Sequence, residues 1–151
     1  MDAEELPLED PVEGRCLCGA VSVRVARAVD ARPGACHCRM CQRWSGALFV
    51  CFAAPAAAVS VSGEVARHAS SDFAERAFCP TCGTHLWMRD TGDPDADYDL
   101  MPGIFDAARD WPLRSEIYSD RAFACARLAG EHRRATGDEW EAEHRFVGDG
   151  G

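Results

Sequence analysis

Gly14-Arg15-Cys16-Leu17-Cys18-Gly19-Ala20-Val21 places two cysteines two residues apart, just before a stretch in which apolar and polar residues alternate. On an extended chain, residues i and i+2 point to the same face, so both sulfurs can reach one ion. Later, Cys79-Pro80-Thr81-Cys82-Gly83 has the spacing of a tight turn that brings two thiolates together, and its glycine permits a positive φ. The two pairs together predict a closed, tetrahedral, four-thiolate site of the structural zinc type, which joins distant strands.

A third motif, Cys36-x-Cys38-x-x-Cys41, offers three thiolates within a short segment. Three protein ligands leave the fourth position of a zinc ion open, which is the arrangement of catalytic zinc. If a helix begins near Cys38, then Cys38 and Cys41 share one face, and the helix N-terminus lowers the pKa of their thiols. Two alternatives remain open: a redox-active dithiol, or a second structural zinc whose fourth ligand is Cys51 or His37.

The composition limits the classes of function. The chain has 151 residues, which fits one domain, and its 25 acidic residues outnumber 16 arginines, giving a net charge of −9 without any lysine. This balance disfavours binding to nucleic acid or to an anionic membrane. No apolar run approaches the ~20 residues of a membrane span, and the acidic N-terminus lacks the pattern of a secretory signal. We therefore expect a cytoplasmic protein whose cysteines are metal ligands or reactive thiols, with Cys51 and Cys125 left as core or spare thiols.

Hydrophobic patterning predicts a mostly β protein with short helices. We expect an acidic N-terminal arm over residues 1–13, a zinc-binding domain over 14–126 and a polar C-terminal extension over 127–151. One short helix is expected to end at Gly46, and another is expected near 138–144. Strands are expected over residues 20–28, 48–52, 59–61, 65–69, 76–79, 84–88, 98–105 and 114–118.

Three stretches together resemble the glutathione-dependent formaldehyde-activating enzyme (GFA) family over about residues 14–125. They are residues 14–21, Cys36-His37-Cys38-Arg39-Met40-Cys41-Gln42-Arg43-Trp44-Ser45-Gly46, and residues 76–84; Gly103-Ile104-Phe105-Asp106 also resembles a strand end of the family. The resemblance implies an Mss4-like fold of coiled β-sheets held together by zinc. It further implies two zinc ions per chain, a structural one held by Cys16, Cys18, Cys79 and Cys82 and a catalytic one held by Cys36, Cys38 and Cys41.

The resemblance also implies a reaction, the addition of glutathione to formaldehyde to form S-hydroxymethylglutathione, and the reverse cleavage. The chain would then be a carbon–sulfur lyase of the S-hydroxymethylglutathione synthase type, with a small-molecule thiol and an aldehyde as partners and glutathione as co-substrate. We expect the glutathione sulfur, or the formaldehyde oxygen, at the open position of the second zinc, with the other reactant alongside. Candidates for moving the proton are His37, His85 and Ser45, while Arg39 and Arg43 are candidates for binding the glutathione carboxylates.

Two other functions compete with the enzyme. A non-enzymatic zinc protein of the same fold could be a glutathione-binding carrier or a protein-interaction module. A zinc ribbon that binds nucleic acid is the third possibility, and the negative net charge argues against it. One position departs from the family pattern, because Phe123 stands where the family often has a tryptophan.

Overall fold

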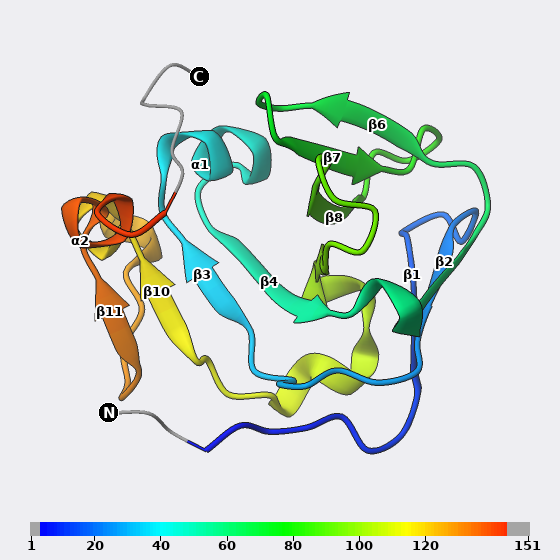
Figure 1. Cartoon of the computed structure of the whole chain (residues 1–151), viewed down its shortest axis with the longest axis horizontal. Helices are drawn as coiled ribbons and strands as arrows, with labels where there is room; N and C mark the ends of the chain where they lie inside the picture. Colours follow the sequence, from blue (N-terminus) through cyan, green and yellow to red (C-terminus); the bar gives the residue numbers. More distant parts are fainter. Residues whose placement is uncertain (1–3, 145–151) are drawn as a thin grey trace. The chain divides into compact units, whose positions relative to one another are not determined.

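A computed structural model describes residues 4–144, so residues 1–3 of the expected N-terminal arm and 145–151 of the expected C-terminal extension lie outside the description. Over the described residues the chain forms eleven β-strands, two α-helices and five short 3-10 helices (Figure 1). The predicted mostly β class is therefore confirmed. The chain divides into a larger unit, of residues 5–32 and 51–111, and a smaller unit, whose described part is mainly residues 33–50 and 112–144. No helix within residues 4–144 is long and apolar enough to cross a membrane.

One sheet of the larger unit is antiparallel with the order β1-β2-β5, and these strands span Val12–Arg15, Ser22–Val25 and Val59–Ser62. β2 forms because Val23 and Val25 alternate with polar residues, which gives the strand one buried and one exposed face. Val23 lies opposite Val61 of β5. β1 ends directly before Cys16, so the first cysteine pair follows a strand that is fixed by its pairing with β2.

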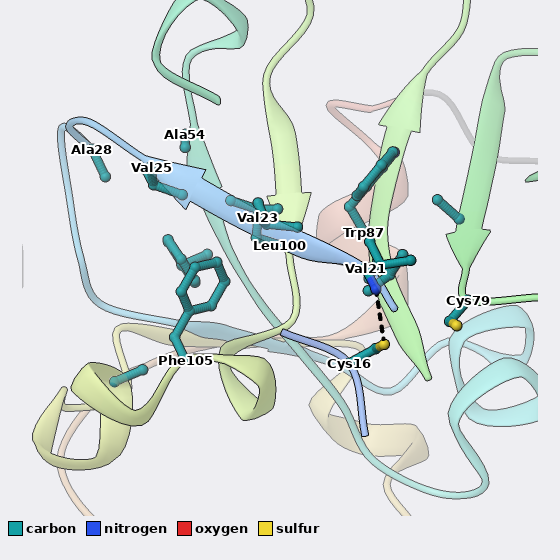
Figure 2. Close-up of a cluster of buried hydrophobic side chains, with 14 residues drawn as sticks. Cys16, Val21, Val23, Val25, Ala28, Ala54, Cys79, Trp87, Leu100 and Phe105 are labelled. Carbon is teal, nitrogen blue, oxygen red and sulfur yellow. Dashed lines mark hydrogen bonds between the residues drawn. The ribbon is translucent and has the colours of Figure 1, made fainter. Parts of the chain in front are cut away.

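The other strands of the larger unit follow the antiparallel order β4-β9-β8-β7-β6. They span Phe49–Ala54, Tyr98–Leu100, His85–Asp90, Ala74–Phe78 and Ala66–Ala69. Trp87 of β8 and Leu100 of β9 lie opposite one another and are almost completely buried. Figure 2 shows them in one hydrophobic cluster with Phe105, Cys16 and Cys79, so two of the clustered cysteines belong to the core of this unit.

In the smaller unit, β3 (Gly34–Cys36), β10 (Ser115–Ile117) and β11 (Arg133–Ala135) pair in parallel in the order β11-β10-β3. Helix α1 (Arg39–Ser45) follows β3 and ends at Gly46, as expected, because the φ of 105° at this residue suits glycine. Helix α2 (Gly137–Glu141) begins with a capping box formed by Thr136 and Glu139.

The 3-10 helices η1, η2 and η3 of the larger unit span Ala56–Ala58, Pro102–Ile104 and Asp106–Asp110, and η4 and η5 of the smaller unit span Ser119–Arg121 and Ala124–Ala126. Helix η2 corrects the strand expected over 98–105. That strand ends at Leu100, because Pro102 has no N–H to continue a ladder and starts a helical turn instead. The strands β1, β3 and β11 were not expected.

Part of the N-terminal arm expected over residues 1–13 makes backbone hydrogen bonds within the larger unit. Its second half is paired with the larger unit: the Leu8 N–H donates to the Ala28 carbonyl at 3.0 Å, and the Ala31 N–H donates to the Leu6 carbonyl at 2.6 Å. β1 then begins at Val12. Leu8 and Val12, which lie among the acidic residues, pack against the hydrophobic cluster of this unit, and the backbone supplies the hydrogen bonds.

Candidate metal centres

The four-cysteine site lies in the larger unit, where the sulfurs of Cys16, Cys18, Cys79 and Cys82 are all within 4.8 Å of one another. Cys16 Sγ and Cys18 Sγ are 3.6 Å apart, and Cys18 Sγ and Cys79 Sγ are 3.8 Å apart. A zinc ion with four bonds of about 2.3 Å to sulfur requires separations of about 3.8 Å between the sulfurs. These free thiols therefore fit a tetrahedral thiolate site.

Two turns of similar construction position these sulfurs. The Gly19 N–H donates to the Cys16 carbonyl at 3.1 Å, and the Gly83 N–H donates to the Cys79 carbonyl at 2.8 Å. Gly19 and Gly83 have φ values of 83° and 78°, in the region that glycine adopts at the lowest cost. In the first turn the Val21 N–H also donates to Cys16 Sγ at 3.3 Å, which favours the thiolate there.

Thr84 joins the two turns and affects their protonation. Its Oγ1 accepts from the Leu17 N–H at 3.0 Å and lies 3.1 Å from Cys82 Sγ. Hydrogen bonds with Thr84 lower the pKa of the Cys82 thiol to about 5. At Cys18 the backbone N–H of Ala20 lowers the pKa, but desolvation and the neighbouring cysteines outweigh it and raise the pKa to about 11. Four sulfurs this close cannot all be thiolates at low cost without a counter-charge, and a divalent cation would supply that charge.

The three-cysteine site lies in the smaller unit, where the sulfurs of Cys36, Cys38 and Cys41 are within 4.8 Å of one another. Cys36 is the last residue of β3, Cys38 is the N-cap of α1, and Cys41 lies in its first turn. The Cys41 N–H donates to Cys38 Sγ at 3.4 Å, so the helix does begin at the expected place. The end of a strand and the start of a helix therefore bring the three sulfurs together.

The three sulfurs of this group also affect one another's protonation. Hydrogen bonds with Cys38 and Cys41, followed by burial and by repulsion from the same two sulfurs, raise the pKa of Cys36 well above its ordinary value. Within the described part of the smaller unit, no further cysteine, histidine or carboxylate joins the group. Cys51, half-buried in β4, and Cys125, which is exposed, belong to neither site. A tetrahedral metal held by these three sulfurs alone keeps one position for another ligand.

The three candidates for proton transfer, His37, Ser45 and His85, lie in different surroundings. His37 is fully buried, and its Nε2 lies 2.8 Å from Glu116 Oε1. The Ser45 hydroxyl donates to the Cys41 carbonyl, four residues earlier in α1, at 2.7 Å. His85 is half-buried in the larger unit, where burial lowers its pKa. His37 Nε2 and the Ser45 hydroxyl are thus occupied by structural hydrogen bonds.

Arg39 and Arg43 lie one helical turn apart on α1 and line an open pocket of about 390 Å³ together with Gln42, Gly46 and Phe123. No ion pair within residues 4–144 engages either guanidinium. Two like charges at i and i+4 destabilise a helix by about 0.2–0.5 kcal/mol. The pocket therefore presents two positive charges on the same short helix that carries Cys41, in a chain that is acidic overall.

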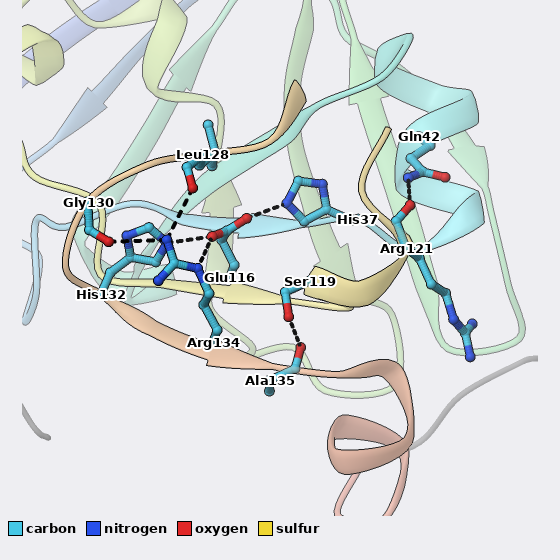
Figure 3. A network of polar contacts seen from close by, with 10 residues as sticks. All are labelled: His37, Gln42, Glu116, Ser119, Arg121, Leu128, Gly130, His132, Arg134 and Ala135. Carbon is cyan, nitrogen blue, oxygen red and sulfur yellow. Dashed lines mark hydrogen bonds and ion pairs between the residues drawn. The ribbon is translucent and has the colours of Figure 1, made fainter. Parts of the chain in front are cut away.

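A buried polar network in the smaller unit was not foreseen. Glu116 is the centre of β10, is 3% exposed, and contacts His37, His132 and Arg134 (Figure 3). The sequence did carry a signal, because an acidic residue in the middle of an otherwise plausible buried strand requires partners. Those partners lie 79, 16 and 18 residues from Glu116 in the sequence, so no local pattern connects them with it.

Residues 11–121 match the family described as Glutathione-dependent formaldehyde-activating enzyme. An uncharacterized lyase of Schizosaccharomyces pombe is 30% identical over 128 residues, which cover 84% of this chain and 92% of the relative. A crystal structure of a Rhodobacter sphaeroides protein is similar in fold, with a TM-score of 0.54 and 24% identity, over 67% of this chain and 98% of that one. The matched residues include all seven clustered cysteines.

Proposed function

The chain belongs to the glutathione-dependent formaldehyde-activating enzyme family, and from this premise we propose that it is a zinc-dependent carbon–sulfur lyase acting on a small-molecule thiol and an aldehyde. In the direction of synthesis, the thiol sulfur bonds to the carbonyl carbon of formaldehyde, and the thiol proton passes to the carbonyl oxygen. With glutathione as the thiol, the product is S-hydroxymethylglutathione, and the reverse reaction breaks the same carbon–sulfur bond. The addition involves no net oxidation or reduction.

The observation that carries this proposal is the contrast between the two cysteine sites. Cys16, Cys18, Cys79 and Cys82 would complete the coordination of a structural zinc, whereas Cys36, Cys38 and Cys41 would hold a second zinc with one position free. Zinc bound by Cys36, Cys38 and Cys41 would lower the pKa of a further thiol, which is the chemistry that the addition requires. Thiolate ligands persist in a reducing compartment, and this supports the cytoplasmic location expected from the sequence.

The residues beside the three-cysteine site would bind and orient the thiol substrate. Arg39 and Arg43 present donors suited to carboxylates, of which glutathione has two, and Phe123 adds an apolar wall that is half exposed. Holding the thiol and the aldehyde side by side replaces a bimolecular encounter by an oriented one, and this proximity is the main gain in rate that we expect from the protein.

One observation favours a non-enzymatic role as the second candidate. His37 Nε2 and the Ser45 hydroxyl are both held in hydrogen bonds of the fold, so neither is available at its present position to carry the proton. A glutathione-binding carrier needs only the metal and the arginine pocket. The two candidates differ in turnover, because the carrier binds the thiol without accelerating its reaction.

Exchange spectroscopy by NMR distinguishes them. The interconversion of formaldehyde, glutathione and their adduct is measured with the wild type, with Cys38→Ser and with Cys125→Ser, in which the replaced cysteine is exposed and lies outside both sites. We expect acceleration over buffer by the wild type and by Cys125→Ser, and none by Cys38→Ser. If the wild type only matches the buffer rate, the enzyme proposal fails, and calorimetry with glutathione then tests the carrier.

A further inference from the structure

The carboxylate of Glu116 accepts hydrogen bonds from three side chains inside the smaller unit (Figure 3). Burial raises the pKa of Glu116, but hydrogen bonds with His132 and His37 outweigh burial and keep the pKa below its ordinary value. The group is therefore a carboxylate, which only accepts hydrogen bonds. His37 Nε2–H donates to Oε1 at 2.8 Å, while His132 Nε2–H and Arg134 Nε–H donate to Oε2, the latter at 3.0 Å.

One of these donors lies between two cysteines of the three-cysteine site. His37 separates Cys36 from Cys38, and it is tied to β10 twice. Its backbone N–H donates to the Ile117 carbonyl at 3.0 Å, which extends the parallel pairing of β3 with β10 by one residue, and its ring bonds to Glu116. Because the main chain and the side chain of His37 are both fixed, the relative directions of the Cys36 and Cys38 side chains are fixed as well.

The other two donors come from the C-terminal extension, residues 127–151, which lies beyond the family match at 11–121. In the parallel pairing of β10 with β11, Arg134 lies directly opposite Glu116. Its Nη2 also donates to the carbonyls of Leu128 and Gly130, both at 3.1 Å, so the same guanidinium orders the loop that precedes β11. His132 belongs to that ordered segment, and its side chain is 3% exposed.

We propose that the C-terminal extension is a support for the three-cysteine metal site: Arg134 and His132 hold Glu116, Glu116 holds His37, and His37 sets the spacing of Cys36 and Cys38. These four are positioning residues, because none of them supplies a metal ligand. Without the two donors of the extension, Glu116 would be a buried carboxylate with one partner, and the segment that holds His37 would lose its anchor. The inference concerns metal binding and does not depend on the reaction proposed above.

Neighbouring arginines of β11 provide a matched test. Both arginines are exposed on β11, but only Arg134 of the two contacts Glu116. Arg134→Gln and Arg133→Gln therefore remove the same charge from adjacent positions. The full chain is loaded with zinc, and metal release to a chromophoric chelator is followed in both variants and in the wild type. The phase that is missing in Cys38→Ser identifies the three-cysteine site, and the remaining phase reports the four-cysteine site.

We expect Arg134→Gln to weaken zinc binding at the three-cysteine site about tenfold or more, with the four-cysteine site unchanged and Arg133→Gln like the wild type. Arg134 is half exposed, so its replacement spares the buried core that Glu116→Gln would disturb. His132→Gln is the second variant, and it should weaken the same phase. The proposal is wrong if Arg134→Gln and His132→Gln leave zinc binding at the three-cysteine site unchanged, or if Arg133→Gln weakens it as much as Arg134→Gln does. It is also wrong if zinc binding at both cysteine sites weakens together.

Discussion

Replacing Gly63 by alanine tests the account of how the four-cysteine site is held in place. Gly63 follows β5 with a φ of 102°, a conformation that residues with a Cβ rarely adopt. A Cβ added here would lie 2.1 Å from the carbonyl oxygen of Ala20 and 3.1 Å from the Val21 Cα. Ala20 and Val21 close the turn that carries Cys16 and Cys18, so the substitution pushes directly on the backbone of the four-cysteine site.

The expected cost has two parts. The unfavourable backbone conformation costs about 1–3 kcal/mol, and the overlap with backbone atoms that cannot rotate away costs a further ~1–3 kcal/mol. Gly63→Ala should therefore lower the free energy of unfolding by about 2–6 kcal/mol. For a chain of this length that corresponds to a fall in Tm of about 4–24 °C.

The assay is thermal unfolding at fixed zinc concentration, combined with zinc release from the four-cysteine site. Gly103→Ala is the control, because its Cβ would meet nothing within 4 Å, and we expect it to change stability by less than about 1 kcal/mol. Gly63→Ala should both lower Tm and speed zinc release. If the two glycine variants unfold at the same temperature, or if Gly63→Ala lowers Tm without affecting zinc release, the coupling of this turn to the metal site is refuted.

Two further predictions concern the smaller unit. The first is a pH dependence of stability. The pKa of Glu116 in the folded protein is depressed below its ordinary value of 4.5. The ionised carboxylate therefore stabilises the fold above pH 4.5, and this stabilisation is lost as the pH falls through the folded-state pKa. Glu116→Gln should lower the free energy of unfolding by about 3 kcal/mol at pH 7. In denaturant titrations, the difference in this free energy between the variant and the wild type should become smaller below pH 4.5. A difference that stays constant with pH would contradict the assignment of a buried carboxylate. The second concerns the pocket: Arg39→Gln combined with Arg43→Gln should raise KM for glutathione more than it lowers kcat, whereas exposed Arg24→Gln should change neither. Equal KM values in both variants would place the thiol elsewhere.

The sequence predicted those features whose cause lies within a few residues. Valines alternating with polar residues indicated β2, and Gly46 indicated the end of α1. The spacing within each cysteine motif reflects local geometry, in which a strand end, a helix N-cap or a tight turn brings two or three sulfurs together. The structure groups the cysteines four and three in the same way.

Features that depend on pairing between segments far apart in the sequence could not be predicted from local patterns. β3 and β11 span three residues each, so neither has enough alternation to be recognised, and both exist because β10 pairs with them. The burial of Glu116 is explained only by the pairing of β10 with β3 and β11, which brings His37 and Arg134 beside it. The acidic composition of the N-terminal arm likewise does not indicate the backbone hydrogen bonds that join it to residues 28–31.

The central claim is that the two cysteine sites hold two metals of different character, one structural and one open to a substrate. Metal analysis of the purified chain and of Cys38→Ser tests it most directly. We expect two zinc ions per chain in the wild type and one in Cys38→Ser, with the fold retained in the variant. A wild type with a single zinc ion, or a Cys38→Ser variant that keeps both, would contradict it.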